Sequence, residues 1–283
     1  MANTSTQIAP PPRVQSTKAP IWLRAPLSML RTTTYVIVLF SLVYRAFASL
    51  YWEGRRAWRL NYRVTRQQVY FTAVQSLPLT VFVAVAMGAL LMHQASVVLR
   101  IWGAADLAEW LTVLVLFKEF APLTVALVII ARSANAIVIE LGNMKVNGEI
   151  RALDVLGVNI DRFVILPRLI GMVVSVVLLT IIFCGAGLWG GFYIAKWFGL
   201  LESDFLFLTL QANFTPAILI NIILRAFCFG MVISSVACHH GLSVQVSPVE
   251  VPQQASQGVV RALSLCFVLN FLISVYVPTD FEL

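Results

Sequence analysis

Long apolar runs alternate with short polar segments along most of this chain. A helix needs about 20 consecutive apolar residues to cross the hydrocarbon core of a bilayer. Five runs approach or exceed that length: Val69–Met92, Leu107–Ile139, Phe163–Phe198, Ala217–Cys238 and Val259–Val277. The pattern therefore predicts an all-α polytopic integral membrane protein with five transmembrane helices.

The segment before the first run has a different character. Its apolar stretch, Tyr35–Trp52, is short and contains Arg45, a charge that is costly at the bilayer centre. We therefore expect residues 21–62 to form an amphipathic helical region that lies along the membrane interface. Residues 1–20 are rich in Pro, Thr and Ser and are expected to form a disordered tail. Residues 63–283 then make up one membrane domain.

A polar island, Glu140–Gly157, separates the second run from the third. Four of its apolar side chains recur at near-helical spacing: Met144, Val146, Ile150 and Leu153. Glycine takes the left-handed conformation that ends helices without strain, so Gly157 is a plausible helix stop. The island predicts a short amphipathic helix, over about 143–157, that lies on the membrane surface and is offered to a soluble partner.

Charge sets the expected orientation. A mean hydropathy of +0.86 excludes a soluble globular domain, while the net charge is +7. Ten of the 20 Lys and Arg residues precede the first run, and four more lie in or near the island. The positive-inside rule therefore places the N-terminus and the island in the cytoplasm, and five spans place the C-terminus outside. No pattern of interleaved basic and aromatic residues indicates nucleic-acid binding.

No motif for catalysis is present. The chain lacks a Gly-x-x-x-x-Gly-Lys-Ser/Thr phosphate loop, a Gly-x-Ser-x-Gly elbow and a His-Glu-x-x-His helix. Its four cysteines have no Cys-x-x-Cys spacing, and the adjacent His239 and His240 have no carboxylate beside them in sequence, so we expect no metal and no cofactor. If this protein moves a substrate against a gradient, its energy comes from a separate subunit that docks on the island.

The island itself carries a long motif with fixed spacing. It reads Glu140-x-Gly-x-Met-Lys-Val-x-x-Glu149-Ile-x-Ala-Leu-x-x-Leu-Gly157, followed by Pro167-Arg168. Further matches flank it: Lys118-Glu119-Phe-Ala-Pro122-Leu, Ala131-Arg132-Ser133 and Arg225-Ala-x-x-Phe229-Gly230. Together they resemble the MlaE (YrbE) permeases, which are the membrane subunits of MCE-type lipid ABC transporters. The resemblance covers roughly Val69 to the C-terminus.

This resemblance implies a function and a set of partners. The chain would be the non-catalytic permease subunit of an ATP-driven lipid transporter, with phospholipid as the substrate class, in a bacterial inner membrane. It would work as a homodimer with a separate ABC ATPase and an MCE-domain protein outside. The island would be the coupling helix that inserts into the ATPase, with five contact candidates: Met144, Lys145, Glu149, Ile150 and Leu153.

Two charges near the middle of predicted spans are further candidates. Glu119 and Arg225 either form a structural ion pair between helices or line a lipid cavity, where Arg225 would meet a phosphate. Apolar residues of the first span are candidates for the wall of that cavity: Leu77, Val81 and Val85.

Departures from the family pattern mark a divergent member. Arg151 replaces the usual Asp, Asn159-Ile160 stands where Asp-Pro is common, and Asn270 stands where Asp is common. A basic residue on the docking helix requires a matching change on the ATPase, so this chain's ATPase is expected to be specific to it.

Two other functional classes stay open at this point. An ion-coupled secondary carrier of a lipophilic substrate would use a membrane charge such as Glu119 as its ion site and would need no ATPase. A non-transporting membrane scaffold would tolerate neutral replacements of both Glu119 and Arg225.

Overall fold

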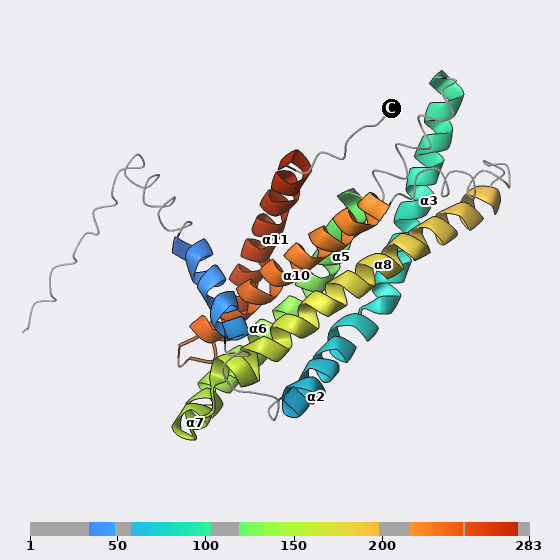
Figure 1. Ribbon diagram of the computed structural model, residues 1–283. Helices are drawn as coiled ribbons and strands as arrows, with labels where there is room; N and C mark the ends of the chain where they lie inside the picture. Colours follow the sequence, from blue (N-terminus) through green and yellow to red (C-terminus); the bar gives the residue numbers. More distant parts are fainter. Residues whose placement is uncertain (1–33, 49–57, 103–118, 198–215, 246, 277–283) are drawn as a thin grey trace, which may run out of the picture. The chain divides into compact units, whose positions relative to one another are not determined.

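The computed structural model describes residues 34–48, 58–102, 119–197, 216–245 and 247–276, and these residues contain helices and turns but no strand (Figure 1). The chain divides into two units, Met1–Val38 and Leu39–Leu283, and the membrane-spanning helices belong to the second. The tail predicted over residues 1–20 lies outside the described residues, as do residues 21–33 and 49–57 of the predicted interfacial region.

Five helices of the described chain are long and apolar enough to cross a membrane. They are Tyr62–Leu91, Ala121–Val146, Asp161–Ile194, Ile218–Ser243 and Glu250–Tyr276. The predicted all-α architecture with five spans is confirmed. A shorter apolar helix, Thr34–Ala48, precedes them, and its position along the membrane interface remains a prediction.

The helices extend further than the apolar runs that predicted them. The first span begins at Tyr62 rather than Val69, and the last begins at Glu250 rather than Val259. Helical hydrogen bonds join backbone groups whatever the side chain. A helix can therefore include polar residues such as Gln67 and Gln68, which stand directly before the first apolar run.

The spans are built from several helical segments. The first comprises α2 (Trp58–Val69), the π-helical turn η1 (Tyr70–Val74) and α3 (Leu77–Trp102). The second comprises α5 (Ala121–Ile129), the π-helical turn η3 (Ile130–Ala134) and α6 (Asn135–Val146). The others are η4 (Asp161–Ile165) with α8 (Leu166–Trp197), then α10 (Pro216–Ser243) and α11 (Glu250–Tyr276). The short helix α7 (Glu149–Val155) connects the second and third spans.

A proline marks the interruption of the first span. Pro78 lacks a backbone N–H and stands in the first turn of α3, where no such donor is needed. The helix breaks at Gln75 and Ser76, immediately before this turn. After the break the helical bonding resumes: the Ser76 carbonyl accepts hydrogen bonds from the backbone N–H and the hydroxyl of Thr80, at 2.9 and 2.8 Å. A proline within a helix predicts a kink, and at Pro78 the structure has a break in the helix.

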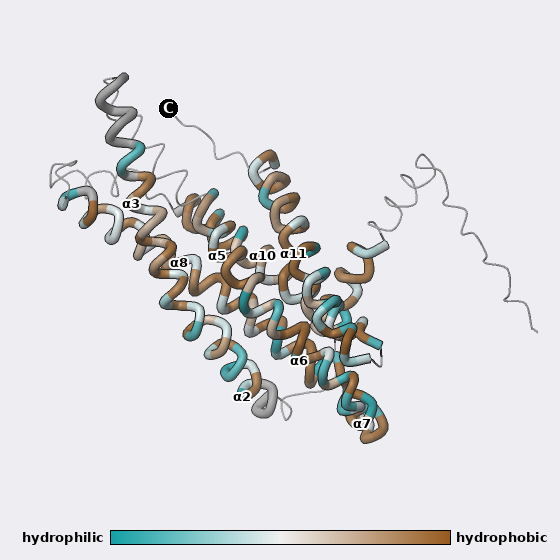
Figure 2. Tube along the Cα trace, turned by 180° about the vertical axis from the view of Figure 1, so that it is seen from behind, coloured by the Kyte–Doolittle hydropathy of each residue, from teal (hydrophilic) through white to brown (hydrophobic). Residues whose placement is uncertain are grey.

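The centre of the bundle is formed by α8 and α10. One side of α8 packs against α2 and α3 and another against α10, while α10 also packs against α6 and α11 (Figure 1). Hydrophobic residues run along these helices, and hydrophilic residues gather around α2 and α7 (Figure 2). The starts of α2 and α8 and the end of α6 lie at the α7 end of the bundle, whereas α3 and α8 finish at the opposite end (Figure 1).

Glycines allow α3 and α8 to touch through their backbones. A Cβ atom built on Gly88 would lie 2.0 Å from the carbonyl oxygen of Gly187, and one on Gly191 would lie 2.8 Å from the carbonyl carbon of Gly88. Gly187 and Gly191 form the Gly-x-x-x-Gly spacing of α8, which permits such close approach in membranes. The spacing alone did not show which helix would be the partner, and the structure identifies α3.

We expect Gly88→Ala to lower the free energy of unfolding by about 1–3 kcal/mol, because the new methyl group must push two backbones apart. Gly185→Ala is the matched control on α8: nothing lies within 4 Å of its Cβ position, so it should be close to neutral. Thermal unfolding of both variants in detergent measures the difference. Equal melting temperatures for the two variants would contradict a role for this backbone contact.

Candidate functional sites: the α7 surface and the Glu119 network

The polar island folds as two helices joined by a turn, not as the single helix predicted over 143–157. The second span ends at Val146, and α7 begins at Glu149. Between them, Gly148 has a φ of 75°, a conformation that glycine adopts without strain. The Asn147 N–H donates to the Asn143 carbonyl at 2.9 Å and the Gly148 N–H to that of Lys145 at 3.1 Å, which closes the turn. The apolar periodicity across the island missed this break.

The end of α7 agrees with the prediction. Gly157 has a φ of 73°, and its N–H donates to the Asp154 carbonyl at 2.9 Å. The next N–H, from Val158, reaches the Leu153 carbonyl at 3.0 Å. This pair of bonds is the Schellman motif, so Gly157 is confirmed as the residue that ends the helix.

The turn divides the five contact candidates into two groups. Met144 and Lys145 lie on the last turn of α6 and are engaged within the protein: Lys145 Nζ donates to the carbonyl of Leu242 on α10, and Met144 Sδ lies 3.7 Å from Arg168 Nη2. Glu149, Ile150 and Leu153 lie on α7, which contains no buried residue. The first group therefore holds the base of the turn. Lys145 and Glu149 are exposed, whereas Met144, Ile150 and Leu153 are half-buried.

The most exposed apolar residues in this region were not among the predicted contacts. Val155 is 82% exposed and Leu156 75% exposed, directly before Gly157, and Val249, directly before α11, is 70% exposed. A signal was available in the sequence, since Val155 and Leu156 are adjacent apolar residues within the polar island. Apolar side chains that no residue of this chain covers mark an interaction surface. We call Val155, Leu156 and the exposed residues of α7 the α7 surface.

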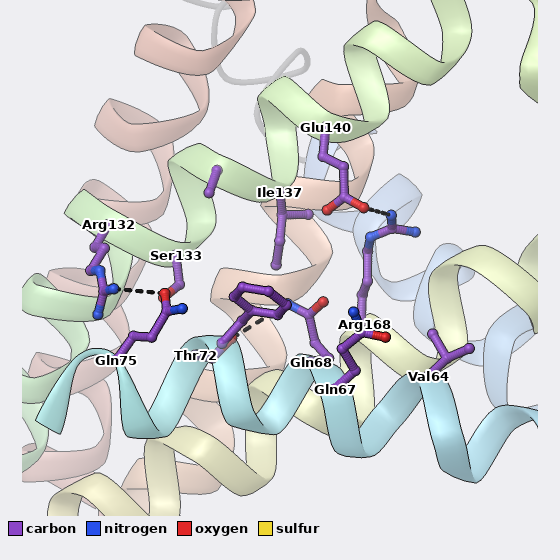
Figure 3. A pocket seen from close by; sticks show the side chains of 12 residues that line it. Val64, Gln67, Gln68, Thr72, Gln75, Arg132, Ser133, Ile137, Glu140 and Arg168 are labelled. Atoms are coloured by element: carbon purple, nitrogen blue, oxygen red, sulfur yellow. Dashed lines mark hydrogen bonds and ion pairs between the residues drawn. The ribbon is translucent and has the colours of Figure 1, made fainter.

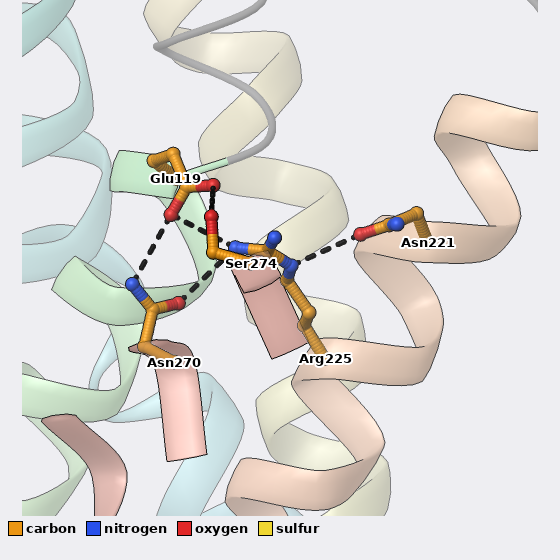
Figure 4. A network of polar contacts seen from close by, with 5 residues as sticks. All are labelled: Glu119, Asn221, Arg225, Asn270 and Ser274. Atoms are coloured by element: carbon orange, nitrogen blue, oxygen red, sulfur yellow. Dashed lines mark hydrogen bonds and ion pairs between the residues drawn. The ribbon is translucent and has the colours of Figure 1, made fainter. Parts of the chain in front are cut away.

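Glu119 and Arg225 meet in the structure. Arg225 Nη1 donates to Glu119 Oε2 at 2.9 Å, and the Arg225 side chain is fully buried while that of Glu119 is 30% exposed (Figure 4). Asn221, one turn earlier on α10, accepts from Arg225 Nε at 3.0 Å. The sequence left open whether these charges pair, and the geometry shows an interhelical ion pair.

Helix α11 completes this network. Asn270 accepts from Arg225 Nη1 at 3.2 Å and donates from Nδ2 to Glu119 Oε2 at 3.1 Å, so one side-chain amide contacts both charges (Figure 4). Ser274 donates to the other carboxylate oxygen of Glu119 at 2.9 Å. Asn270 had been noted only as a departure from the family pattern. An amide offers a donor and an acceptor at once, which lets it bridge the pair, whereas an ionised Asp offers only acceptors.

The network lies towards one end of the bundle rather than at mid-span as predicted. Arg225 is about 13 Å from the start of α10 and about 27 Å from its end, at 1.5 Å per residue. Glu119 directly precedes α5, and Ser274 lies in the last turn of α11. This is the end opposite α7. Residues 107–118, which the sequence assigns to the second span, lie outside the described residues.

The predicted wall residues Leu77, Val81 and Val85 lie along α3. Leu77 is 37% exposed, and a Cβ atom built on Gly190 of α8 would lie 2.6 Å from a methyl group of Val85. Val85 therefore packs against α8. A cavity of about 380 Å³ does open beside the first span, but none of these three residues, nor Glu119 or Arg225, lines it.

The described residues contain no group of three or more His, Cys, Asp or Glu side chains that could hold a metal ion. His240 Nδ1 instead lies 2.9 Å from Gln254 Oε1, which joins α10 to α11.

These features define a multi-pass membrane protein with five spans and an exposed helical turn between the second and third. A family described as Permease MlaE matches residues 65–276. The chain therefore belongs to the MlaE permease family.

Relatives share this region at low identity. The intermembrane phospholipid transport system permease protein MlaE of Haemophilus influenzae is 26% identical over 222 residues, covering 78% of this chain and 85% of its own length. A probable ABC transporter permease protein of Synechocystis is 26% identical over 217 residues, covering 76% and 82%. The chloroplastic protein Trigalactosyldiacylglycerol 1 of Arabidopsis thaliana is 22% identical over 157 residues, covering 56% and 45%.

We expect the two partners of the ion pair to differ in the stability that is lost when each is replaced. Glu119→Gln leaves a fully buried guanidinium without its counter-charge and should cost about 3 kcal/mol of stability. Arg225→Met should cost less, because Glu119 is partly exposed and keeps its bonds from Asn270 and Ser274. The double variant should lose less stability than the two single variants lose together.

Thermal melts of the two single variants and the double variant test this cycle. Ser274→Ala is the control, since it removes only an exposed hydrogen bond to the same carboxylate. Strictly additive losses, or a larger loss for Arg225→Met than for Glu119→Gln, would argue against a pair that stabilises the bundle.

Proposed function

We propose that this protein is the membrane-embedded permease subunit of an ATP-driven phospholipid transporter, moving lipid between the inner membrane and an MCE-domain protein or the outer membrane. The observation that carries the proposal is the family match over residues 65–276. A phospholipid transport permease, that of Haemophilus influenzae, also aligns with this chain along 85% of its own length. ATP hydrolysis belongs to a separate ABC ATPase chain, and two copies of this protein work together as a homodimer.

The α7 surface supports a docking role. Val155 and Leu156 are exposed, and α7 has no buried residue, so water contacts its apolar side chains unless a partner covers them. A small surface helix makes few contacts, and a few central apolar anchors then supply most of the binding energy. Glu149, Ile150 and Leu153 remain contact candidates on this helix, and Met144 and Lys145 act by fixing the turn that carries it.

Charge supports the proposed orientation. Basic residues gather at the α7 end, with Arg63 and Arg66 on α2, Lys145 and Arg151 in the island and Arg162 on η4. At the far end of α8 the described residues carry Lys196. The positive-inside rule then puts α7 and the N-terminus in the cytoplasm of a bacterial cell and the Glu119–Arg225 network towards the outer side.

Family membership favours this function over the two other classes. A secondary carrier needs a membrane charge that is free to exchange an ion, whereas Glu119 accepts hydrogen bonds from three side chains: Arg225, Asn270 and Ser274. A scaffold has no need for apolar residues held outward on a helical turn. Leu77, Val81 and Val85 stay candidates for contact with lipid tails, since none of the three is fully buried.

The docking role predicts that Leu156→Asp releases the ATPase. A charge at the centre of an apolar contact should weaken association at least 100-fold, equivalent to about 2.7 kcal/mol. Co-purification of the ATPase with tagged permease measures the effect. The matched control is Asn159→Asp, which adds the same charge three residues away and keeps the side-chain oxygen that accepts from the Asp161 N–H. Full ATPase recovery with Leu156→Asp would exclude the α7 surface as the docking site.

The orientation predicts opposite labelling at the two ends of the bundle. In spheroplasts, Lys196→Cys should react with a membrane-impermeant maleimide, whereas Asn147→Cys should react only after the membrane is opened. Both positions are exposed, and Cys184, Cys238 and Cys266 are buried. Half-buried Cys228 is changed to Ser in both variants. Labelling of Asn147→Cys in intact spheroplasts would reverse the proposed topology.

A further inference from the structure

The cavity of about 380 Å³ lies between the first two spans, on the α7 side of the bundle (Figure 3). Eight of the twelve residues that line it have polar side chains. Three amides come from the first span, at Gln67, Gln68 and Gln75. Two arginines face them, Arg132 from the second span and Arg168 from α8, with Glu140 beside Arg168.

Arg132 brings an uncompensated positive charge into this cavity. Nη1 donates to the Ser76 hydroxyl at 3.0 Å and Nη2 to Gln75 Oε1 at 2.9 Å, both neutral acceptors at the break in the first span. No carboxylate among the described residues pairs with it. Arg132 lies about 16 Å from the start of the second span and about 21 Å from its end. An arginine at such a position is costly unless it faces a polar space, and it marks a functional site by default.

Arg168 supplies a second guanidinium with donor capacity to spare. Its Nη2 donates to Glu140 Oε1 at 2.8 Å and its Nη1 to the Val164 carbonyl at 2.9 Å. The side chain is only 10% exposed. Each terminal nitrogen of a guanidinium carries two N–H donors, so Nη1 has one N–H beyond its bond to Val164. Two guanidiniums and one carboxylate leave the lining with a net positive charge.

Both helices that face each other across the cavity are distorted there. Phe71 and Thr72 of the lining lie in the π-helical turn η1, and Arg132 and Ser133 lie in η3. Such π-turns are rare and occur often at functional sites. Arg132 and Glu140 are eight residues apart, so the polar wall extends about 12 Å along the second span, from near the α7 end towards mid-membrane.

From this arrangement we propose that the cavity binds the phosphate group of a lipid from the leaflet on the α7 side, with Arg132 and Arg168 as its donors. Arginine holds phosphate oxygens through paired, charge-assisted hydrogen bonds. Half-exposed apolar side chains at the rim, Val64 and Phe71, would lie against the lipid chains. This headgroup site is distinct from the Glu119–Arg225 network near the opposite end. The lipid as the source of the phosphate rests on the proposed transport function.

Binding of dioctanoyl phosphatidylglycerol to the full-length protein in detergent tests the site. Arg132→Gln and Arg168→Gln should each weaken binding at least tenfold. Arg132→Lys keeps the charge but loses the paired geometry and should fall between Arg132→Gln and the unchanged protein. Arg63→Gln is the control, since it removes an exposed basic residue of α2 outside the cavity. Ala136→Leu is a second, independent test. The larger side chain fills part of the cavity while both arginines stay in place, so it should also weaken binding.

Two further probes separate the sources of the phosphate. Dioctanoylglycerol, which lacks the phosphate, should bind at least tenfold more weakly than the phosphatidylglycerol, and inorganic phosphate should compete only weakly. Inorganic phosphate binding as tightly as the lipid would overturn a lipid site, and equal binding of dioctanoylglycerol would overturn phosphate recognition. Unchanged lipid affinity in both Arg→Gln variants and in Ala136→Leu would overturn the site itself. Because this assay needs no ATPase, its outcome is independent of whether the docking proposal holds.

Discussion

Charged and polar groups in the hydrocarbon core of a bilayer must find their partners within the protein, since lipid tails offer none. This constraint accounts for the polar architecture of the bundle. Arg225 is fully buried and contacts Glu119, Asn221 and Asn270 from its own and two other helical segments. Arg132 uses the acceptors exposed where Pro78 interrupts the first span. Each basic residue therefore joins helices that are distant in sequence, and the same contacts that satisfy a charge fix how the spans pack.

The bundle carries different polar centres at its two ends. Near the start of α10, Arg225 donates to the Glu119 carboxylate and to two amides, and a hydroxyl donates to the same carboxylate. Towards α7, the guanidiniums of Arg132 and Arg168 border a cavity with one carboxylate between them. The first centre pairs its arginine with a carboxylate that also accepts from Asn270 and Ser274, whereas the second borders a cavity of about 380 Å³. This difference leads us to assign a structural role to the first centre and a ligand to the second.

The α7 surface, which we propose as the docking site, is linked to these internal features. Lys145 ties the end of α6 to α10, and Arg168, which lines the cavity, holds Glu140 on α6 and contacts Met144. The turn at Gly148 then places α7 outside the bundle with its apolar residues uncovered. Movement imposed on α7 would act directly on the helix end that carries Glu140 and thus on one wall of the cavity.

Apolar run length alone determined the all-α class and the number of spans, because the thickness of the hydrocarbon core imposes a minimum helix length. Local chemistry also placed the helix stop at Gly157 and the interruption at Pro78. The family motif located the island but not its geometry: the apolar spacing of Ile150 and Leu153 continues a helix that Gly148 breaks. Tertiary structure alone decided that Glu119 pairs with Arg225, that Asn270 bridges them and that Arg132 and Arg168 share a cavity. Those contacts join residues 36 to 151 positions apart, and sequence periodicity carries no information across helices about which faces will meet.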